Sequence, residues 1–144
     1  MSATNSFETA LLQHIFQNAN IADIGDATGL RGSSAAGNVH IALFTADPGE
    51  AGAITNEATY TGYGRVAVPR TAGGFTVVDN NVSNAGTVTF GECTAGSNTI
   101  THFAVMKLST GDNMILKGAL TQSLAVSAGI TPEFAIGDLD VNVE

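Results

Sequence analysis

One stretch decides the fold class: Thr99-Ile-Thr-His-Phe-Ala-Val-Met-Lys-Leu108, then Ser109-Thr-Gly-Asp-Asn113, then Met114-Ile-Leu-Lys-Gly118. From Thr99 to Leu108 the side chains alternate with the period of two that is typical of a strand. The five residues that follow are polar and include a glycine, which favours a tight turn. Apolar residues return directly after the turn. We therefore predict a β-hairpin of two antiparallel strands.

Short segments with strand-like patterns lie on both sides of this hairpin. They are Val39–Phe44, Tyr63–Val68, Phe75–Val78, the region from Val82 to Phe90, Leu120–Val126, Phe134–Ile136 and Leu139–Val143. Turn chemistry separates them, as in Asp47-Pro48-Gly49. Because no second helix lies between strands, the pattern predicts a mainly β domain over residues 39–144, built as an antiparallel β-sandwich or jelly-roll-like barrel.

One amphipathic helix is predicted ahead of this β domain, from Phe7 to about Asn18. Phe7, Leu11 and Ile15 recur at i, i+4 and i+8 and form one apolar stripe. A second apolar ridge lies beside it and consists of Leu12, Phe16 and Ala19. A stripe this broad must pack against its own domain or against a neighbouring subunit.

Small polar residues mark both ends of the predicted helix. Asn5 or Ser6 is the expected N-cap, and Asn5 with Glu8 has the spacing of a capping box. Asn18 and Asn20 suit the helix end, since asparagine tolerates the left-handed conformation.

The segment Ile21–Asn38 is rich in glycine, serine and alanine and shows little periodicity. It is predicted to be a long loop or arm, and loops of this length usually have a function or are mobile. Residues 1–38 are therefore assigned to an N-terminal helix and arm.

The charge of the chain argues against phosphate-bearing partners. Five Lys and Arg against thirteen Asp and Glu give a net charge of −8. The five cations are scattered singly: Arg31, Arg65, Arg70, Lys107 and Lys117. We therefore expect neither nucleic acid nor an anionic membrane as a partner. No signal peptide and no membrane-spanning stretch is visible, so the chain is expected to be made in a cytosol.

No motif in the sequence predicts catalysis, a cofactor or a metal. His14, His40 and His102 lie outside metal-ligand spacings, and the two strand histidines are expected to be hydrogen-bonded sheet residues. Cys93 has no partner cysteine and is expected to be a small buried residue. A nucleophile elbow is also missing. The sequence thus favours a protein that is not an enzyme.

Much of the chain resembles small virion proteins of tailed bacteriophages, some tail-fibre-like and others capsid decoration (cement) proteins. The resemblance is carried by the following segments: the opening helix, His40-Ile-Ala-Leu-Phe-Thr-Ala-Asp-Pro-Gly-Glu-Ala-Gly52, Asn56-Glu57, Thr61-Gly-Tyr-Gly-Arg65-Val-Ala-Val68, Val82–Phe90, Thr101-His-Phe103 and Gly118–Phe134. It implies a structural virion protein whose binding free energy lies in interfaces rather than in one pocket.

The first expectation from this resemblance is capsid decoration. The chain would bind and stabilise adjacent major capsid proteins, or other virion proteins, as a homo-oligomer for which a trimer is one option. The residues expected to make contacts are Phe7, Leu11, Ile15, Asp47, Pro48, Glu50 and Arg65. Those from Asp47 to Glu50 belong to a predicted contact loop that continues to Gly52.

Two alternatives remain open. The first is a tail fibre or tail-tip subunit, which copy number in the particle would separate from decoration. The second is a host-receptor or glycan-binding module, with a shallow site lined by Tyr60, Tyr63, Asp47 and Glu57, which lie near one another in sequence.

Overall fold

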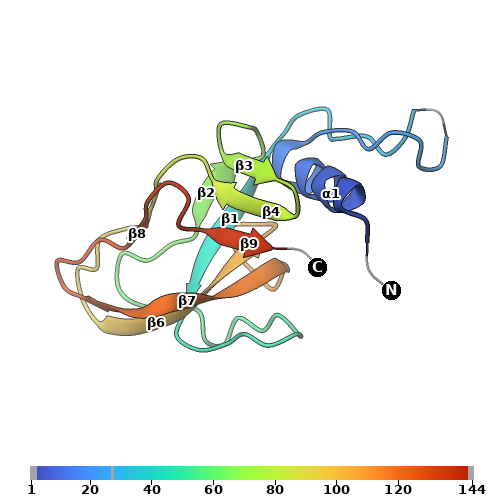
Figure 1. The fold of residues 1–144 in the computed structure, drawn as a ribbon. Helices are drawn as coiled ribbons and strands as arrows, with labels where there is room; N and C mark the ends of the chain where they lie inside the picture. The colour runs from blue at the N-terminus through green and yellow to red at the C-terminus, as the bar shows by residue number, and fades with distance from the viewer. Residues whose placement is uncertain (1–2, 27, 143–144) are drawn as a thin grey trace. The chain divides into compact units, whose positions relative to one another are not determined.

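The structure is a computed structural model that describes residues 3–26 and 28–142. The chain is mainly β, with antiparallel sheets and one N-terminal helix, as predicted (Figure 1). Its elements are α1 (Asn5–Gln17), β1 (Asn38–Phe44), β2 (Val66–Pro69), β3 (Phe75–Val78), β4 (Asn81–Asn84), β5 (Val88–Thr89), β6 (Ser97–Met106), β7 (Met114–Ser127), β8 (Glu133–Phe134) and β9 (Asp140–Asn142). They form three sheets with the orders β2-β1-β6-β7, β3-β4-β9 and β5-β8.

The described residues divide into two compact units. The first, which we call the sheet unit, consists of residues 39–68 and 88–133. The second, the helix unit, consists of the described residues of 1–38, 69–87 and 134–144. The chain passes from the helix unit to the sheet unit after Asn38. The helix unit also takes in β3, β4 and β9, because α1 packs on the first two of these strands.

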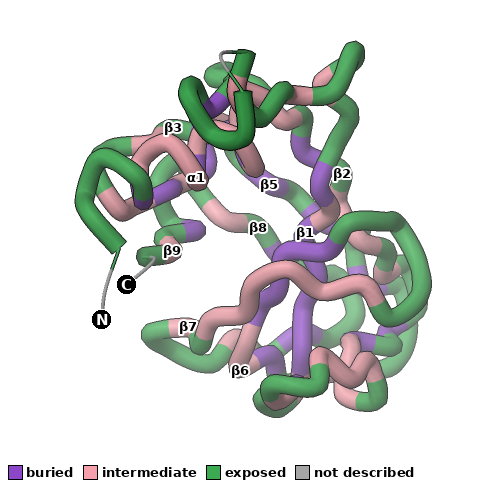
Figure 2. Tube along the Cα trace, turned by 90° about the vertical axis from the view of Figure 1, so that its right-hand side faces the viewer, coloured by how far each residue is buried: buried purple, intermediate pink, exposed green. Residues whose placement is uncertain are grey.

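The core of the sheet unit is built on β1 and β6. The two strands pair antiparallel from His40 opposite Met106 to Phe44 opposite His102. Each ends in four consecutive buried residues, so both faces of the sheet are covered here, and Figure 2 shows β1 as largely buried. On one face a cluster of buried side chains is covered by Ile54 and Met114. The cluster consists of Ala42, Phe44, Ala104 and Met106.

The predicted hairpin is present, but its second strand is longer than predicted. The segments Met114–Gly118 and Leu120–Val126, expected as separate strands, belong to the single strand β7. Gly118 does not interrupt the strand, because it lies opposite Phe103 on β6 and makes room for that ring. A Cβ atom at Gly118 would lie 2.6 Å from the Phe103 ring. The glycine is therefore explained by cross-strand packing.

Strands β2, β8 and β9 are shorter than the sequence pattern suggests. Strand β2 begins at Val66 rather than Tyr63, and β8 ends at Phe134. Strand β9 covers Asp140–Asn142, and Val143, predicted to end it, lies outside the described residues. Alternating side chains define a strand only where a neighbouring backbone is present to pair with it.

In the helix unit, α1 buries the second of the two predicted apolar ridges. Leu12 and Phe16 are almost fully buried, and the Phe16 ring meets Phe75 of β3 edge to face at 4.9 Å. The predicted stripe is more accessible: Phe7 is 41 % exposed, and Leu11 and Ile15 are half-buried. The helix thus keeps an apolar surface facing away from its own core.

The two ends of α1 differ in how well they were predicted. The N-cap is Thr4, which makes no side-chain capping bond, so the predicted cap at Asn5 or Ser6 is wrong. At the other end Asn18 adopts the left-handed conformation (φ 57°), as predicted. Ala19 N–H then donates to the Gln13 carbonyl at 3.1 Å, a bond that satisfies one of the last helical carbonyls.

The segment that follows α1 is a loop, as predicted, and is held by local hydrogen bonds. Ile21 and Leu30 exchange two backbone bonds of 2.8 Å each. The Asn18 side chain accepts from Ser33 N–H at 2.7 Å, and the Asn20 side chain accepts from Gly32 N–H at 2.9 Å. Side-chain to backbone bonds of this kind replace a sheet ladder in such loops.

The sheet unit contains a close crossing of two backbone segments at Gly62. Thr61 N–H donates to the Ala95 carbonyl and Thr94 N–H donates to the Thr61 carbonyl, both at 2.9 Å. Gly62 has φ +105°, and a Cβ atom there would lie 2.0 Å from the Glu92 carbonyl oxygen. Only glycine fits this position without moving backbone.

We therefore expect Gly62→Ala to lower the free energy of unfolding by about 2–4 kcal/mol, since it adds backbone strain and a steric clash. Urea unfolding followed by circular dichroism measures the change. The matched control is Gly64→Ala, because a Cβ atom at Gly64 has no neighbour within 4 Å. Equal stability of the two variants would contradict the account of the crossing.

Candidate interaction surfaces

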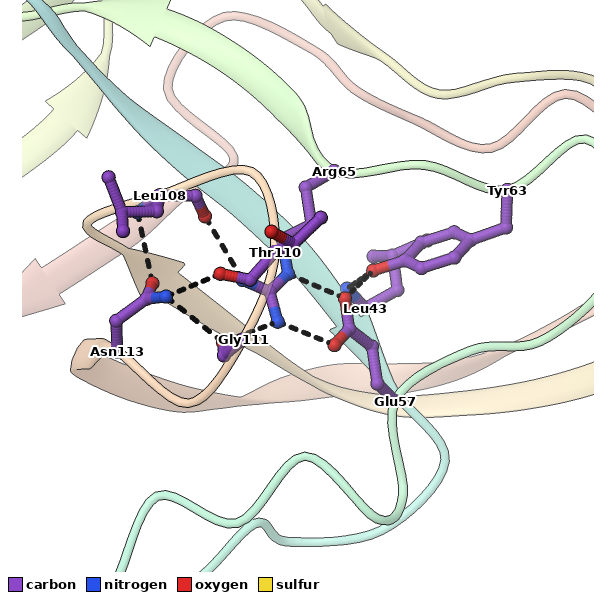
Figure 3. A network of polar contacts seen from close by, with 8 residues as sticks. All are labelled: Leu43, Glu57, Tyr63, Arg65, Leu108, Thr110, Gly111 and Asn113. Atoms are coloured by element: carbon purple, nitrogen blue, oxygen red, sulfur yellow. Dashed lines mark hydrogen bonds and ion pairs between the residues drawn. The ribbon is translucent and has the colours of Figure 1, made fainter.

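The most densely connected charged group in the sheet unit is Arg65, one of the predicted contact residues (Figure 3). Its Nε and Nη2 atoms donate to the two carboxylate oxygens of Glu57, both at 2.7 Å. Nη1 donates to the Leu108 carbonyl and Nη2 to the Gly111 carbonyl, both at 3.0 Å. The Arg65 side chain is only 3 % exposed. This bidentate pair therefore ties the Glu57 loop to the β6–β7 turn.

Tyr63 completes the network on the other side of Glu57. Its hydroxyl donates to Glu57 Oε1 at 2.8 Å and accepts from Leu43 N–H at 3.1 Å (Figure 3). Burial raises the pKa of Tyr63 well above its usual range, and the Glu57 hydrogen bonds raise the pKa of Arg65. Both groups therefore keep their protons at every physiological pH, so Tyr63 remains a donor and Arg65 a cation in this network, which we call the brace.

This brace changes the interpretation of two predicted sites. The guanidinium of Arg65, predicted as a contact residue, binds Glu57 and two backbone carbonyls of its own chain. Tyr60 is only 3 % exposed, and its hydroxyl donates to the Gly91 carbonyl at 3.1 Å. Glu57, Tyr60 and Tyr63 do come together, but their rings and polar tips face inward, whereas a sugar-stacking site needs an accessible ring.

The predicted contact loop from Asp47 to Gly52 lies against β7. Lys117 Nζ binds Asp47 Oδ1 at 2.9 Å and Glu50 Oε1 at 3.2 Å. Pro48 is buried, so of the three predicted contact residues in this loop only Asp47 and Glu50 are exposed. The hydrogen bond from Lys117, followed by that from Gly49 N–H, lowers the pKa of the Asp47 carboxyl. The loop is therefore attached to the sheet through a partly exposed ion pair.

In the helix unit, Arg70 fixes the end of α1. Its Nη2 donates to the His14 carbonyl at 2.8 Å, its Nε to the Ile15 carbonyl, and its Nη1 to the Ala36 carbonyl at 3.1 Å. A cation at these positions satisfies carbonyls of the last helical turn and complements the negative end of the helix dipole. The surface formed by Phe7, Leu11 and Ile15, which we call the α1 stripe, therefore sits on an immobilised helix.

The histidines and the cysteine occupy sheet and core positions. The His102 ring lies 2.8 Å from Thr101 Oγ1, as expected for a hydrogen-bonded strand histidine. His40 Nδ1, in contrast, is buried with no hydrogen-bond partner among the described residues. Cys93 is fully buried, and its thiol lies 3.5 Å from two backbone carbonyls.

Neither a metal centre nor a membrane-spanning helix is present among the described residues. No group of three His, Cys, Asp or Glu side chains is arranged to hold a metal ion within residues 3–26 and 28–142. Over the same ranges no helix has the length and apolar character needed to cross a bilayer.

We expect Arg65→Met to lower the free energy of unfolding by about 3 kcal/mol or more. The substitution leaves the Glu57 carboxylate, 15 % exposed, without its bidentate partner, and an uncompensated buried charge is strongly destabilising. Thermal and urea unfolding measure the loss. Lys107→Met is the matched control, because Lys107 is exposed. If Arg65→Met and Lys107→Met both unfold with the same free energy as the wild type, the brace contributes little to stability.

The attachment of the contact loop should survive mild acid. Because the pKa of Asp47 lies below its usual 3.8, the ion pair with Lys117 is complete above pH 3.8 and is lost as the pH falls through the lowered pKa. A carboxyl-carbon NMR titration measures this pKa directly. In Lys117→Met the pKa of Asp47 should rise toward its usual value, and an unchanged value would refute the pairing.

Comparison with known proteins shows the family to which the chain belongs. No curated protein matches the chain significantly. A family model described as "Podophage GP4 fiber I protein gp80" matches residues 2–142, nearly the entire sequence. The chain therefore belongs to the podophage GP4 fiber I protein gp80 family, and it is a structural protein of the virion of tailed bacteriophages.

Proposed function

We propose that this protein is a fibre subunit that acts by docking onto neighbouring virion proteins and has no catalytic role. The observation that carries the proposal is the family match over residues 2–142, whose description is that of a fibre protein. A fibre subunit works through repeated contacts along an assembly, so its chemistry is that of interfaces.

The distribution of polar and apolar groups supports docking rather than phosphate recognition. Three of the five cations are engaged inside the chain: Arg65 by Glu57, Arg70 by backbone carbonyls, and Lys117 by Asp47 and Glu50. Clustered, available cations are what nucleic acid and anionic membranes require. The α1 stripe, by contrast, offers apolar side chains on a fixed helix, which is the chemistry of a protein–protein contact.

Capsid decoration is the second candidate, because the small virion proteins that the chain resembles include capsid decoration proteins. Both roles use the same kind of docking surface, with the major capsid protein as the neighbour in one case and fibre or tail proteins in the other. The two roles differ in copy number and in position on the particle.

Quantitative mass spectrometry of purified virions, combined with immunogold labelling, tests the proposal. A fibre subunit is expected in few copies relative to the major capsid protein, with label confined to fibres. Hundreds of copies with label spread over the shell would overturn the fibre assignment in favour of decoration. Turnover of a substrate by the purified chain in a hydrolase panel would contradict a purely structural role.

The α1 stripe gives a prediction at the level of a residue. We expect Leu11→Asp to reduce incorporation into particles severalfold while leaving the melting temperature nearly unchanged, because Leu11 lies on the half-buried stripe and not in the core. Ser6→Asp, which adds the same charge at an exposed position of α1, is the control. Wild-type incorporation of Leu11→Asp would show that this face is not a contact surface.

A further inference from the structure

Strand β7 forms one edge of the four-stranded sheet. Strand β7 is the last in the order β2-β1-β6-β7 and pairs with β6 on one side in two stretches, 114–119 and 124–127, with a register shift between them. Within the described ranges no other strand pairs with its second side. It runs for 14 residues, whereas strands usually have about five or six. Such an edge presents a row of N–H and C=O groups that can pair with another chain.

A cavity of about 290 Å³ lies along the beginning of this edge. Four consecutive β7 residues line it, Met114 to Lys117. These four residues lie on the strand directly beside the loop that forms the opposite wall of the cavity. Its other walls are the loop Gly49–Gly52 and three residues at the β6–β7 turn, which are Lys107, Asp112 and Asn113. The shape is that of a groove beside a strand.

Many side chains of β7 are apolar, but few of them are buried. Val126 is its one buried residue, whereas β1 and β6 each contain runs of four, and Figure 2 shows the same difference. Ile115 is a bulge residue, because its neighbours Leu116 and Met114 pair with Val105 and Met106 and leave Ile115 without a β6 partner. Ile115 is half-buried beside the groove, so part of its apolar surface remains exposed and could be buried by association with another chain.

The charge that usually protects a sheet edge is compensated here. Lysine on an edge strand discourages pairing with a second chain. Lys117 is the one charged residue of β7, and Asp47 and Glu50 already bind it. In a chain of net charge −8, this edge is therefore a region where two copies approach without strong like-charge repulsion.

We propose that the outer edge of β7 pairs with β7 of a second copy of this chain, so that one sheet continues across a homodimer interface. The other edge strand, β2, is a poorer partner, because it has four residues and ends at Pro69, which has no N–H to donate. Two identical β7 edges instead form a two-fold contact in which the same patch serves on both sides. The proposal rests on the proposed fibre role only for its biological context, and the experiments that test it do not depend on that role.

Sedimentation equilibrium of the purified full chain tests the interface. The wild type should show a monomer–dimer equilibrium, and Ile115→Lys should raise the dissociation constant about tenfold or more, since it places an unpaired ammonium in the contact. Leu108→Lys is the control: Leu108 is 60 % exposed at the same turn and does not line the groove. Melting curves of both variants, measured at low concentration, establish that the monomer is folded.

Hydrogen exchange of β7 amides gives a second readout that needs no variant. Protection of amides in Met114–Ala119 should increase with protein concentration. A wild type that stays monomeric at high concentration, or a dimer unaffected by Ile115→Lys, would overturn the proposal. β7 amides protected only inside intact particles would assign the groove to a strand of another virion protein and would equally overturn it. These outcomes leave the copy number per particle, and with it the fibre assignment, untouched.

Discussion

The ion pair between Arg65 and Glu57 is the interaction on which the sheet unit depends. It is bidentate, almost fully buried on the arginine side, and extended by Tyr63 and by two carbonyls of the β6–β7 turn. Burying two charges is favourable only when nearly every donor and acceptor around them is used, and here five hydrogen bonds meet this condition. Because the brace joins loop to turn, it also fixes where β7 begins.

Because of this brace, the residues whose chemistry suggests a function have a structural role, and residues that resemble core are partly accessible. The residues with catalytic or sugar-binding chemistry, Glu57, Tyr60 and Tyr63, hold the unit together. The residues that look like ordinary core, such as Phe7 and Ile115, are the ones left partly accessible. For a virion structural protein this arrangement makes physical sense, since apolar area left on a rigid surface is what association buries.

The sequence predicts those regions of the fold that depend on local periodicity. Strands β1, β3 and β6 and the end of α1 at Asn18 follow from alternation and from asparagine chemistry. What fails depends on partners distant in sequence. Two apolar ridges of α1 are equivalent by pattern, and the packing of the helix on β3 and β4, including the contact of Phe16 with Phe75, determines which ridge is buried. Gly118 resembles a break until Phe103 is placed opposite it, and no local signal pairs Arg65 with Glu57.

Rigidity connects the two proposed contact surfaces. Arg70 satisfies carbonyls at the end of α1, and Asp47 and Glu50 bind Lys117 on β7. In each case polar side chains next to the proposed contact surface bind the element that carries it and restrict its movement. Ordering side chains and loops during association opposes binding by about 0.5–1.5 kcal/mol for each immobilised side chain. A subunit that is already ordered at α1 and β7 loses less entropy with every copy that docks, and in a repeating assembly this gain recurs at each contact.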